Sequence, residues 1–197
     1  MCGVLVAVLS GCVTAPVPST EPKTPDDARF AVVRTAESLV GKKQFEWNGQ
    51  RFNGDCVVFV RLVYAENGID LYRMRGRSSA SGVETVFEYV RHFGSIHQDS
   101  PRPGDLVFFH DTYDRNRDGL VNDGLTHIGI VKGVESDGTV EVIHRVQRGV
   151  VRYRMNIAHP LDRTRDGRVI NDYLRRDHDG HSVTAGELFA AYATVIL

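Results

Sequence analysis

The sequence predicts an α+β domain in which helices come first and an antiparallel sheet follows. The first half of the chain holds segments with helix-capping residues and apolar residues at helical spacing, whereas short β-branched runs dominate after Pro103. Two of these runs, residues 128–134 and 139–143, are joined by residues 135–138 (ESDG), a hairpin signal. Helices followed by hairpin-connected strands are typical of α+β folds.

The first two helices have clear start signals. Thr24 can cap the first helix, which begins in an acidic turn at a proline, and Gly41 is expected to end it. Asp55 can cap the second helix, which runs to about Asn67. Cys56 therefore falls in the first turn of the second helix.

A third helix and the strands complete the expected domain. Ser81 and Glu84 form a capping box, apolar residues recur at helical spacing behind it, and Gly94 closes the helix. Further strands are expected at residues 106–109, 150–153 and 190–196. The charged stretch 162–181 is expected to be a surface loop.

Length and charge limit the possible functions. The chain has 197 residues, of which 42% are hydrophobic, enough for one compact domain, which we place at residues 26–197. The formal net charge of -1 gives no bulk attraction to nucleic acid or to an anionic membrane. Because no nucleic-acid-binding motif offsets that balance, we expect no nucleic-acid partner.

The N-terminus is typical of a targeting segment. Residues 1–9 are uncharged and apolar, too short to span a bilayer and suited to the core of a signal peptide. Residues 9–12 (LSGC) resemble a bacterial lipoprotein processing box, which makes Cys12 the lipidation candidate and residues 1–12 the signal segment. Residues 13–25, rich in proline, are expected to tether the domain. We therefore expect an exported, membrane-anchored lipoprotein of the cell envelope; the alternative is an ordinary apolar N-terminus.

Cys56 is the candidate reactive thiol. The three cysteines are Cys2, Cys12 and Cys56, so a chain processed at Cys12 retains Cys56 without a disulfide partner in its mature domain. A thiol in the first turn of a helix is expected to have a lowered pKa. The alternative is a small core residue, since the segment CVVFV is apolar.

Two histidines are candidates for the base and its partner. His127 precedes one arm of the expected hairpin and His144 ends the other. The two are expected to lie close together across the ladder, allowing for a bulge or a register offset. A nucleophilic thiol needs a base, and the base needs an orienting partner.

The ordered set of motifs resembles the NlpC-type bacterial cell-wall cysteine peptidases, which are papain-like. The motifs are Gly54-Asp55-Cys56, then residues 102–109 (RPGDLVFF), residues 126–131 (THIGIV) and Ile143-His144. The resemblance implies that Cys56 is the nucleophile, that His127 is the general base and that His144 orients the base. It also implies helices packed on an antiparallel sheet that carries the histidines, and peptidoglycan stem peptides as the substrate.

Departures from the family pattern keep other functions open. Val57 and Val58 replace the usual Ser-Gly, and Phe45 replaces a tyrosine whose hydroxyl helps to hold the substrate in the family. An amidase or acyltransferase of the same fold, or a non-catalytic wall-binding lipoprotein, remains possible. A metal-dependent peptidase is a further alternative, but no tight ligand spacing supports it; its ligands would come from His110, Asp111, His127 and His144.

No cofactor is needed for the proposed chemistry, but one loop has the spacing of a calcium site. Oxygen side chains alternate after residue 113, with a glycine at the sixth position of the loop. The candidate ligands are Asp114, Asn116, Asp118, the Leu120 carbonyl, Asn122 and Asp123. Because position twelve is Leu125 and not glutamate, a solvated turn held by Asp and Asn side chains is the alternative.

Overall fold

The computed structural model describes residues 24–47, 49–73, 81–176 and 180–196. The predicted signal segment, its Cys12 and most of the predicted tether lie outside these residues. None of the helices within the described ranges combines the length and the apolar character needed to cross a bilayer.

The three expected helices are present with the expected caps. They are α1 (Pro25–Ser38), α2 (Cys56–Glu66) and α3 (Gly82–Phe93). The side chain of Thr24 accepts a hydrogen bond from Asp27 N–H, and Asp55 accepts one from Val58 N–H. The capping box of α3 is complete in both directions. Only the end of α1 differs, since the helix ends three residues before Gly41.

A six-stranded antiparallel sheet follows the helices, in the order β3-β12-β4-β5-β6-β7. Its strands are β3 (Ser95–His97), β4 (Leu106–His110), β5 (Leu125–Val134), β6 (Val140–Val146), β7 (Gly149–Met155) and β12 (Phe189–Thr194). The five strands expected from the sequence are confirmed, whereas the short edge strand β3 is not among them. The α+β fold predicted from the sequence is therefore confirmed.

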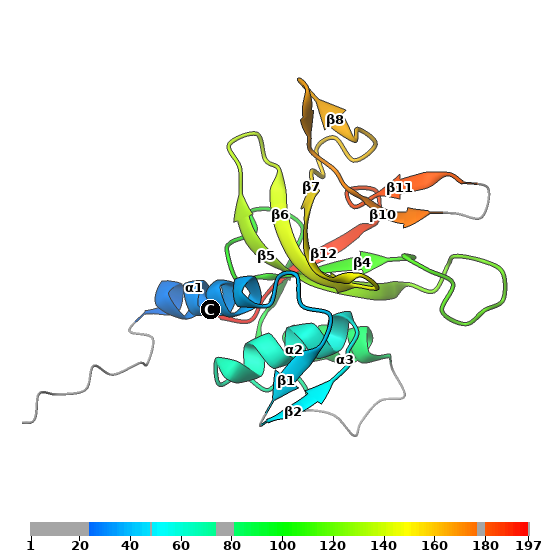
Figure 1. Cartoon of the computed structure of the whole chain (residues 1–197). Coiled ribbons are helices and arrows are strands. Elements are labelled where there is room, and N and C mark those ends of the chain that lie inside the picture. Colours follow the sequence, from blue (N-terminus) through cyan, green and yellow to red (C-terminus); the bar gives the residue numbers. More distant parts are fainter. Residues whose placement is uncertain (1–23, 48, 74–80, 177–179, 197) are drawn as a thin grey trace, which may run out of the picture.

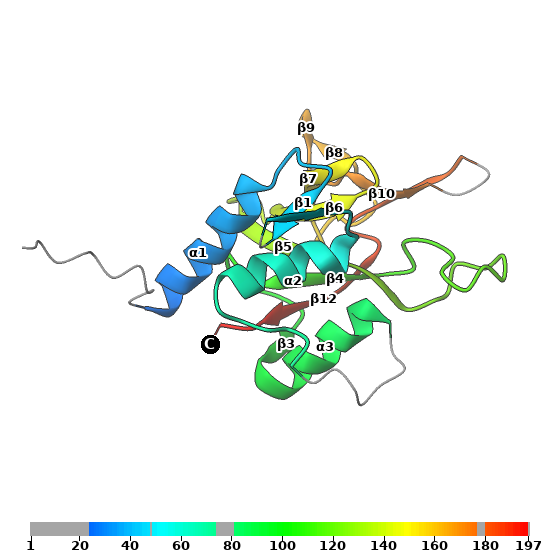
Figure 2. The same cartoon turned by 60° about the horizontal axis from the view of Figure 1, so that its bottom comes forward.

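The sheet is covered on both faces, which explains the unbroken apolar run in β4. Leu106 and Phe108 belong to the core under the helices, and Val107 and Phe109 belong to a second core on the opposite face. In Figure 1, α2 and α3 lie below the sheet and the β8–β11 region lies above it. In the 60° turn of Figure 2, α2 lies in front of the sheet, where it packs mainly against β5 and β6. Strands buried on both faces cannot alternate between apolar and polar residues.

The prediction of a surface loop over residues 162–181 is wrong in part. Short hairpins occupy much of this stretch: β8 (Thr164–Arg165) pairs with β9 (Arg168–Val169), and β10 (Tyr173–Arg176) pairs with β11 (Ser182–Thr184). Asp166 and Gly167 turn the first hairpin with φ of 50° and 76°, as a two-residue turn requires. A further unpredicted hairpin joins β1 (Phe45–Trp47) to β2 (Gln50–Phe52).

A buried carboxylate ties the helical layer to the sheet. Asp105 is fully buried; its Oδ1 lies 2.6 Å from Arg29 Nη1 of α1 and accepts a 2.9 Å hydrogen bond from the Thr194 hydroxyl of β12. Its Oδ2 accepts a 2.8 Å hydrogen bond from Arg102 N–H. Asp105 therefore connects both chain ends of the described domain to the start of β4.

Candidate active site

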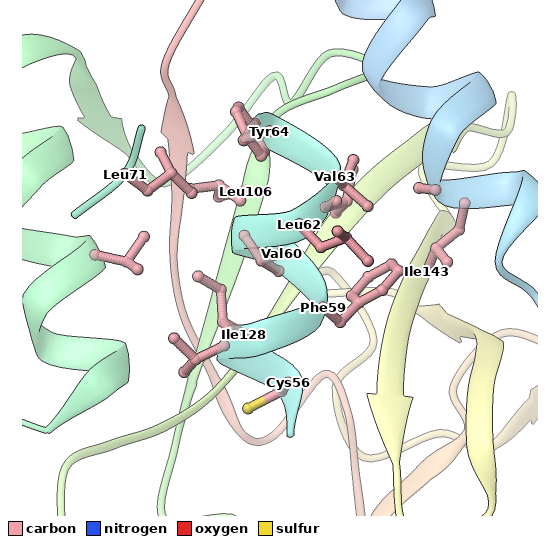
Figure 3. Close-up of a cluster of buried hydrophobic side chains, with 14 of the residues drawn as sticks. Cys56, Phe59, Val60, Leu62, Val63, Tyr64, Leu71, Leu106, Ile128 and Ile143 are labelled. Atoms are coloured by element: carbon pink, nitrogen blue, oxygen red, sulfur yellow. The ribbon is translucent and has the colours of Figure 1, made fainter. Parts of the chain in front are cut away.

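Cys56 is the first residue of α2, and its thiol lies against the sheet. The backbone N–H of Ile128 in β5 is close enough to favour a negative charge on the sulfur, and the side chain is 8% exposed. Figure 3 shows the sulfur of Cys56 at the first turn of α2, with the buried side chains of the later turns above it. Cys56 is therefore next in space to the residue that follows His127.

The thiol of Cys56 does not have the lowered pKa that its helix position predicts. Burial raises the pKa to about 12, and the negative charge of Asp55 acts in the same direction. The backbone amides of Ile128, Val57 and Cys56 favour the thiolate, but their effect is smaller than the loss of hydration. The residue that caps the helix thus opposes ionisation of the thiol beside it.

The two histidines of the sheet are joined by a hydrogen bond. His127 Nε2 and His144 Nδ1 are 2.7 Å apart. Gly129 is the register partner of His144, so His127 lies diagonally across the ladder, two residues from direct pairing. A register shift between Val131 and Gly133 provides the expected irregularity. The prediction that these side chains lie close together is confirmed.

Burial keeps both imidazoles neutral near neutral pH. Loss of hydration lowers the pKa of His127 to about 4, although the charge of Asp55 acts in the opposite direction. Burial also lowers the pKa of His144 well below its ordinary value, and the neighbouring His127 and Arg148 lower it further. The resting site therefore contains a neutral thiol and two neutral imidazoles.

The hydrogen bond between the two rings links their tautomers. A base that receives the thiol proton on Nδ1 carries its own proton on Nε2, which places the Nε2–H of His127 in the contact with His144 Nδ1. His144 then carries its proton on Nε2. That nitrogen is buried and has no hydrogen-bond partner among the described residues.

Cys56 and His127 open into one pocket of about 700 Å³. Its walls come from the starts of α2 and α3, from the loop between β4 and β5, from β5 and β6, and from β10. Besides the two candidate catalytic residues, the lining includes Asp55, Gly82, Tyr113, Arg115, Thr126, Arg145, Gln147 and Leu174. The pocket is large enough for a segment of a peptide substrate.

The loop between β4 and β5 is held together by its own side chains. Asp114 accepts hydrogen bonds from Arg117 N–H and Gly119 N–H, at 2.6 and 2.9 Å. Asn116 Oδ1 accepts from Asp118 N–H at 2.9 Å. These contacts use the same oxygens that the sequence pattern indicates as calcium ligands.

Of the other candidate calcium ligands, one carboxylate is also hydrogen-bonded within the loop, and two residues are exposed to solvent. Asp123 accepts a 2.7 Å hydrogen bond from Arg115 N–H, while Leu120 and Asn122 are exposed. In the part of the chain that the structure describes, no three His, Cys, Asp or Glu side chains are grouped to hold a metal ion. Asp111 contacts its neighbour, since His110 Nδ1 lies 3.0 Å from its Oδ2. The metal-dependent alternative gains no support from this geometry.

The two valines after Cys56 have structural roles. Val57 lines the pocket, and Val58 packs so closely on Gly54 that a β-carbon at Gly54 would lie 2.4 Å from Val58 Cγ1. Phe45, which replaces the tyrosine of the family pattern, is 1% exposed and contacts the rings of Phe52 and Phe59. The absence of a side chain at Gly54 therefore leaves the space that Val58 occupies.

Several pocket residues are not predicted from the sequence, and three of them lie in segments for which the sequence indicates another role. Tyr113 and Arg115 belong to the β4–β5 loop, for which the sequence pattern indicates only metal binding, and Leu174 belongs to the stretch expected to be a surface loop. Tyr113 is half exposed and close enough to Cys56 for a thiolate to raise the pKa of its hydroxyl, after the effect of burial. A tyrosine within a mainly polar loop is the one signal that the sequence offers for this part of the pocket.

A thiol at a helix start and paired histidines on the adjoining antiparallel sheet define the papain-like arrangement. Comparison with known families agrees: the model of the NlpC/P60 family matches residues 41–166, and the chain belongs to this family. The chain is also 31% identical over 107 residues to a protein of Listeria innocua serovar 6a (strain ATCC BAA-680 / CLIP 11262) named "Probable endopeptidase p60". That match covers 52% of this chain and 18% of the Listeria protein. No solved structure matched significantly. Family membership supports a cell-wall peptidase or hydrolase in general terms.

Proposed function

We propose that this chain is a thiol hydrolase that cleaves peptide bonds in the stem peptides of peptidoglycan, with Cys56, His127 and His144 as its triad. The observation that supports it most is the hydrogen-bonded histidine pair beside a pocket that also contains the thiol of Cys56. The Listeria relative, named a probable endopeptidase, supports the same class of reaction.

The neutral resting state determines the order of proton transfers. As the substrate carbonyl approaches, His127 Nδ1 takes the proton of the Cys56 thiol while the sulfur attacks the carbonyl carbon. The imidazolium that forms donates its Nε2–H to His144 Nδ1, which stabilises the new charge. His127 then gives the proton to the leaving nitrogen, and the C–N bond breaks. Water, with His127 as base, releases the acid and restores the thiol.

Product analysis tests this proposal. Purified peptidoglycan fragments incubated with wild-type protein should yield new amine and carboxylate ends, detected by mass spectrometry, and Cys56→Ala should yield none. Arg34→Gln, on the exposed face of α1 and away from the pocket lining, is the control. Fragments that remain intact with wild-type protein under all conditions would leave the non-catalytic wall-binding lipoprotein as the better account.

The same products separate hydrolysis from acyl transfer. A transferase of the same fold would pass the acyl group from Cys56 to an added amine rather than to water. If the protein is a hydrolase, it should still produce mainly free carboxylate when a primary amine acceptor is present. A product that carries the acceptor in excess over the acid would identify an acyltransferase.

We also propose that the chain is exported and anchored through Cys12, with residues 13–25 as a tether. Thirteen residues of extended chain reach roughly 40 Å at about 3.1 Å per residue. Cys12→Ser should move the protein from the membrane fraction to the soluble fraction. If the variant stays in the membrane fraction like wild type, lipid anchoring through Cys12 is wrong.

A structural calcium ion in the β4–β5 loop remains a proposal that rests on ligand spacing. Calcium binding would order the loop ahead of His127 without entering bond cleavage. Calorimetry should show binding that Asp114→Ala with Asp118→Ala removes. No heat and no thermal shift at millimolar calcium would leave only the turn held by side chains.

A further inference from the structure

Leu174 of β10 lies between two cavities of the active site. It lines the open pocket that contains Cys56 and His127, and it also lines a closed cavity beside His144. Among the described residues, Leu174 is the one common to both linings. The side chain is therefore placed where water from the pocket would otherwise reach the inner histidine.

The closed cavity is small and mainly apolar. It measures about 170 Å³ in total and has no space for a water molecule. Its apolar walls are Phe109, Val142, Met155, Ala185 and Leu174. His144 lies in the same lining, and its buried Nε2 has no hydrogen-bond partner within the described structure. A water admitted here would lie beside a buried imidazole that has an unpartnered nitrogen.

The backbone around Leu174 is fixed on both sides. Asp172 accepts a 2.8 Å hydrogen bond from Arg154 N–H of β7, and Arg175 donates a 2.7 Å hydrogen bond to the carbonyl of Asp111. The first contact holds β10 to the sheet, and the second holds it to the start of the β4–β5 loop. Leu174 is thus held in position by its neighbours in sequence.

We propose that Leu174 is a positioning residue that separates His144, the inner member of the histidine pair, from the water of the substrate pocket that His127 lines. Leu174 lies in the C-terminal segment, which comprises residues 156–176 and 180–188 and extends past the end of the family match at residue 166. Through Leu174, this segment contributes a side chain to the catalytic site. This inference rests on the proposed function for its kinetic consequence, but not for its structural one. Exclusion of water keeps both imidazoles neutral and leaves His127 able to accept a proton.

Other charged and titratable groups surround the histidine pair. They are Asp55 and Cys56 at the start of α2, Tyr113 and Arg115 on the β4–β5 loop, Arg145 on β6, Arg148 on the β6–β7 turn, and Tyr153 and Arg154 on β7. All of them are retained when Leu174 is shortened. A change in the titration of His127 in such a variant therefore reports hydration rather than an altered set of charges.

The test compares Leu174→Ala with wild type across pH. With water beside His144, the imidazolium that His127 forms and shares with His144 through their hydrogen bond is better solvated, so the pKa of His127 should rise toward the ordinary value of about 6.5. The acid limb of kcat/KM on peptidoglycan fragments should move upward by about one pH unit or more. Leu174→Met, which preserves the apolar volume, should keep the wild-type limb.

Leu188→Ala is the matched control, because Leu188 is in the same segment, is 3% exposed and lines neither cavity. It should lower stability without moving the acid limb. Equal shifts in Leu174→Ala and Leu188→Ala would indicate general loosening and would overturn the inference. An acid limb in Leu174→Ala within about 0.3 pH units of wild type would also overturn it.

A titration of the histidine ring signals by NMR gives the same comparison without a substrate. If the fragments are not hydrolysed by any variant, the proposed function fails, and the NMR titration alone decides the inference. A raised His127 pKa in Leu174→Ala, absent in Leu188→Ala, supports the role of Leu174. Unchanged titration in both variants rejects it.

Discussion

Acidification should destabilise this protein through His127. The pKa of His127 is lowered to about 4 in the folded state, whereas an unfolded histidine titrates near 6.5. Below pH 6.5 the unfolded chain binds a proton at His127 that the folded chain does not bind. The stabilisation from His127 is therefore fully present above pH 6.5 and is lost as the pH falls toward 4. At pH 5.0 these two values give a loss of about 2 kcal/mol from His127 alone, against almost none at pH 7.5. The lowered pKa of His144 adds to the loss in the same direction.

Urea unfolding at pH 7.5 and pH 5.0 measures this effect. Wild type and His127→Gln share all other titrating groups, so the difference between their pH dependences reports His127 together with its effect on the pKa of His144. The variant should lose about 2 kcal/mol less than wild type between the two pH values. If both proteins lose the same free energy of unfolding, His127 is not a buried neutral base, and the proposed order of proton transfers is wrong.

Three further outcomes follow from the contacts of single side chains. Asp105→Asn should lower the free energy of unfolding by about 3–5 kcal/mol, because it leaves the buried guanidinium of Arg29 without its carboxylate. The control is Asp26→Asn at an exposed position, which should change the free energy of unfolding by less than about 0.5 kcal/mol. Ser81→Ala should cost about 1 kcal/mol through loss of the α3 cap, as seen in a thermal melt. Alkylation of Cys56 by iodoacetamide should accelerate steadily from pH 7 to pH 9 because the thiol pKa is raised to about 12, and a plateau near pH 7 would contradict that pKa.

Most of the helical layer and the central strands are predictable because local signals and tertiary packing agree. The caps at Thr24, Asp55 and Ser81 are side-chain contacts within four residues, and the structure forms all three. The proximity of His127 to His144 follows from the hairpin once a register offset is allowed, and the structure contains that offset between Val131 and Gly133. These are features that neighbouring residues determine.

Two of the three unpredicted hairpins have a recognisable turn signal in the sequence between their strands. Asp166-Gly167 joins β8 to β9, and Asn48-Gly49 separates the residues of β1 and β2. Both dipeptides are typical of two-residue hairpin turns, but the strands beside them have only two or three residues. Such short strands show no alternation of apolar and polar residues, so their turns are the main signal.

The electrostatics of the site cannot be inferred from local sequence. A helix start favours a thiolate, yet β5 and the pocket walls bury Cys56, and loss of hydration outweighs the helix dipole. Leu174, for which we propose a role in the same site, lies more than 100 residues after Cys56 in the sequence. Burial by distant segments is a property of the folded structure and not of the motif around Cys56.

The most direct test of the central claim is to observe the covalent intermediate on Cys56. Wild-type protein mixed with peptidoglycan stem fragments and quenched in acid within the first turnovers should show a mass increase equal to one acyl fragment, mapped to the peptide that contains Cys56. Cys56→Ala should show no adduct and should lose roughly a thousandfold or more in turnover. Turnover by Cys56→Ala at the wild-type rate would contradict the account.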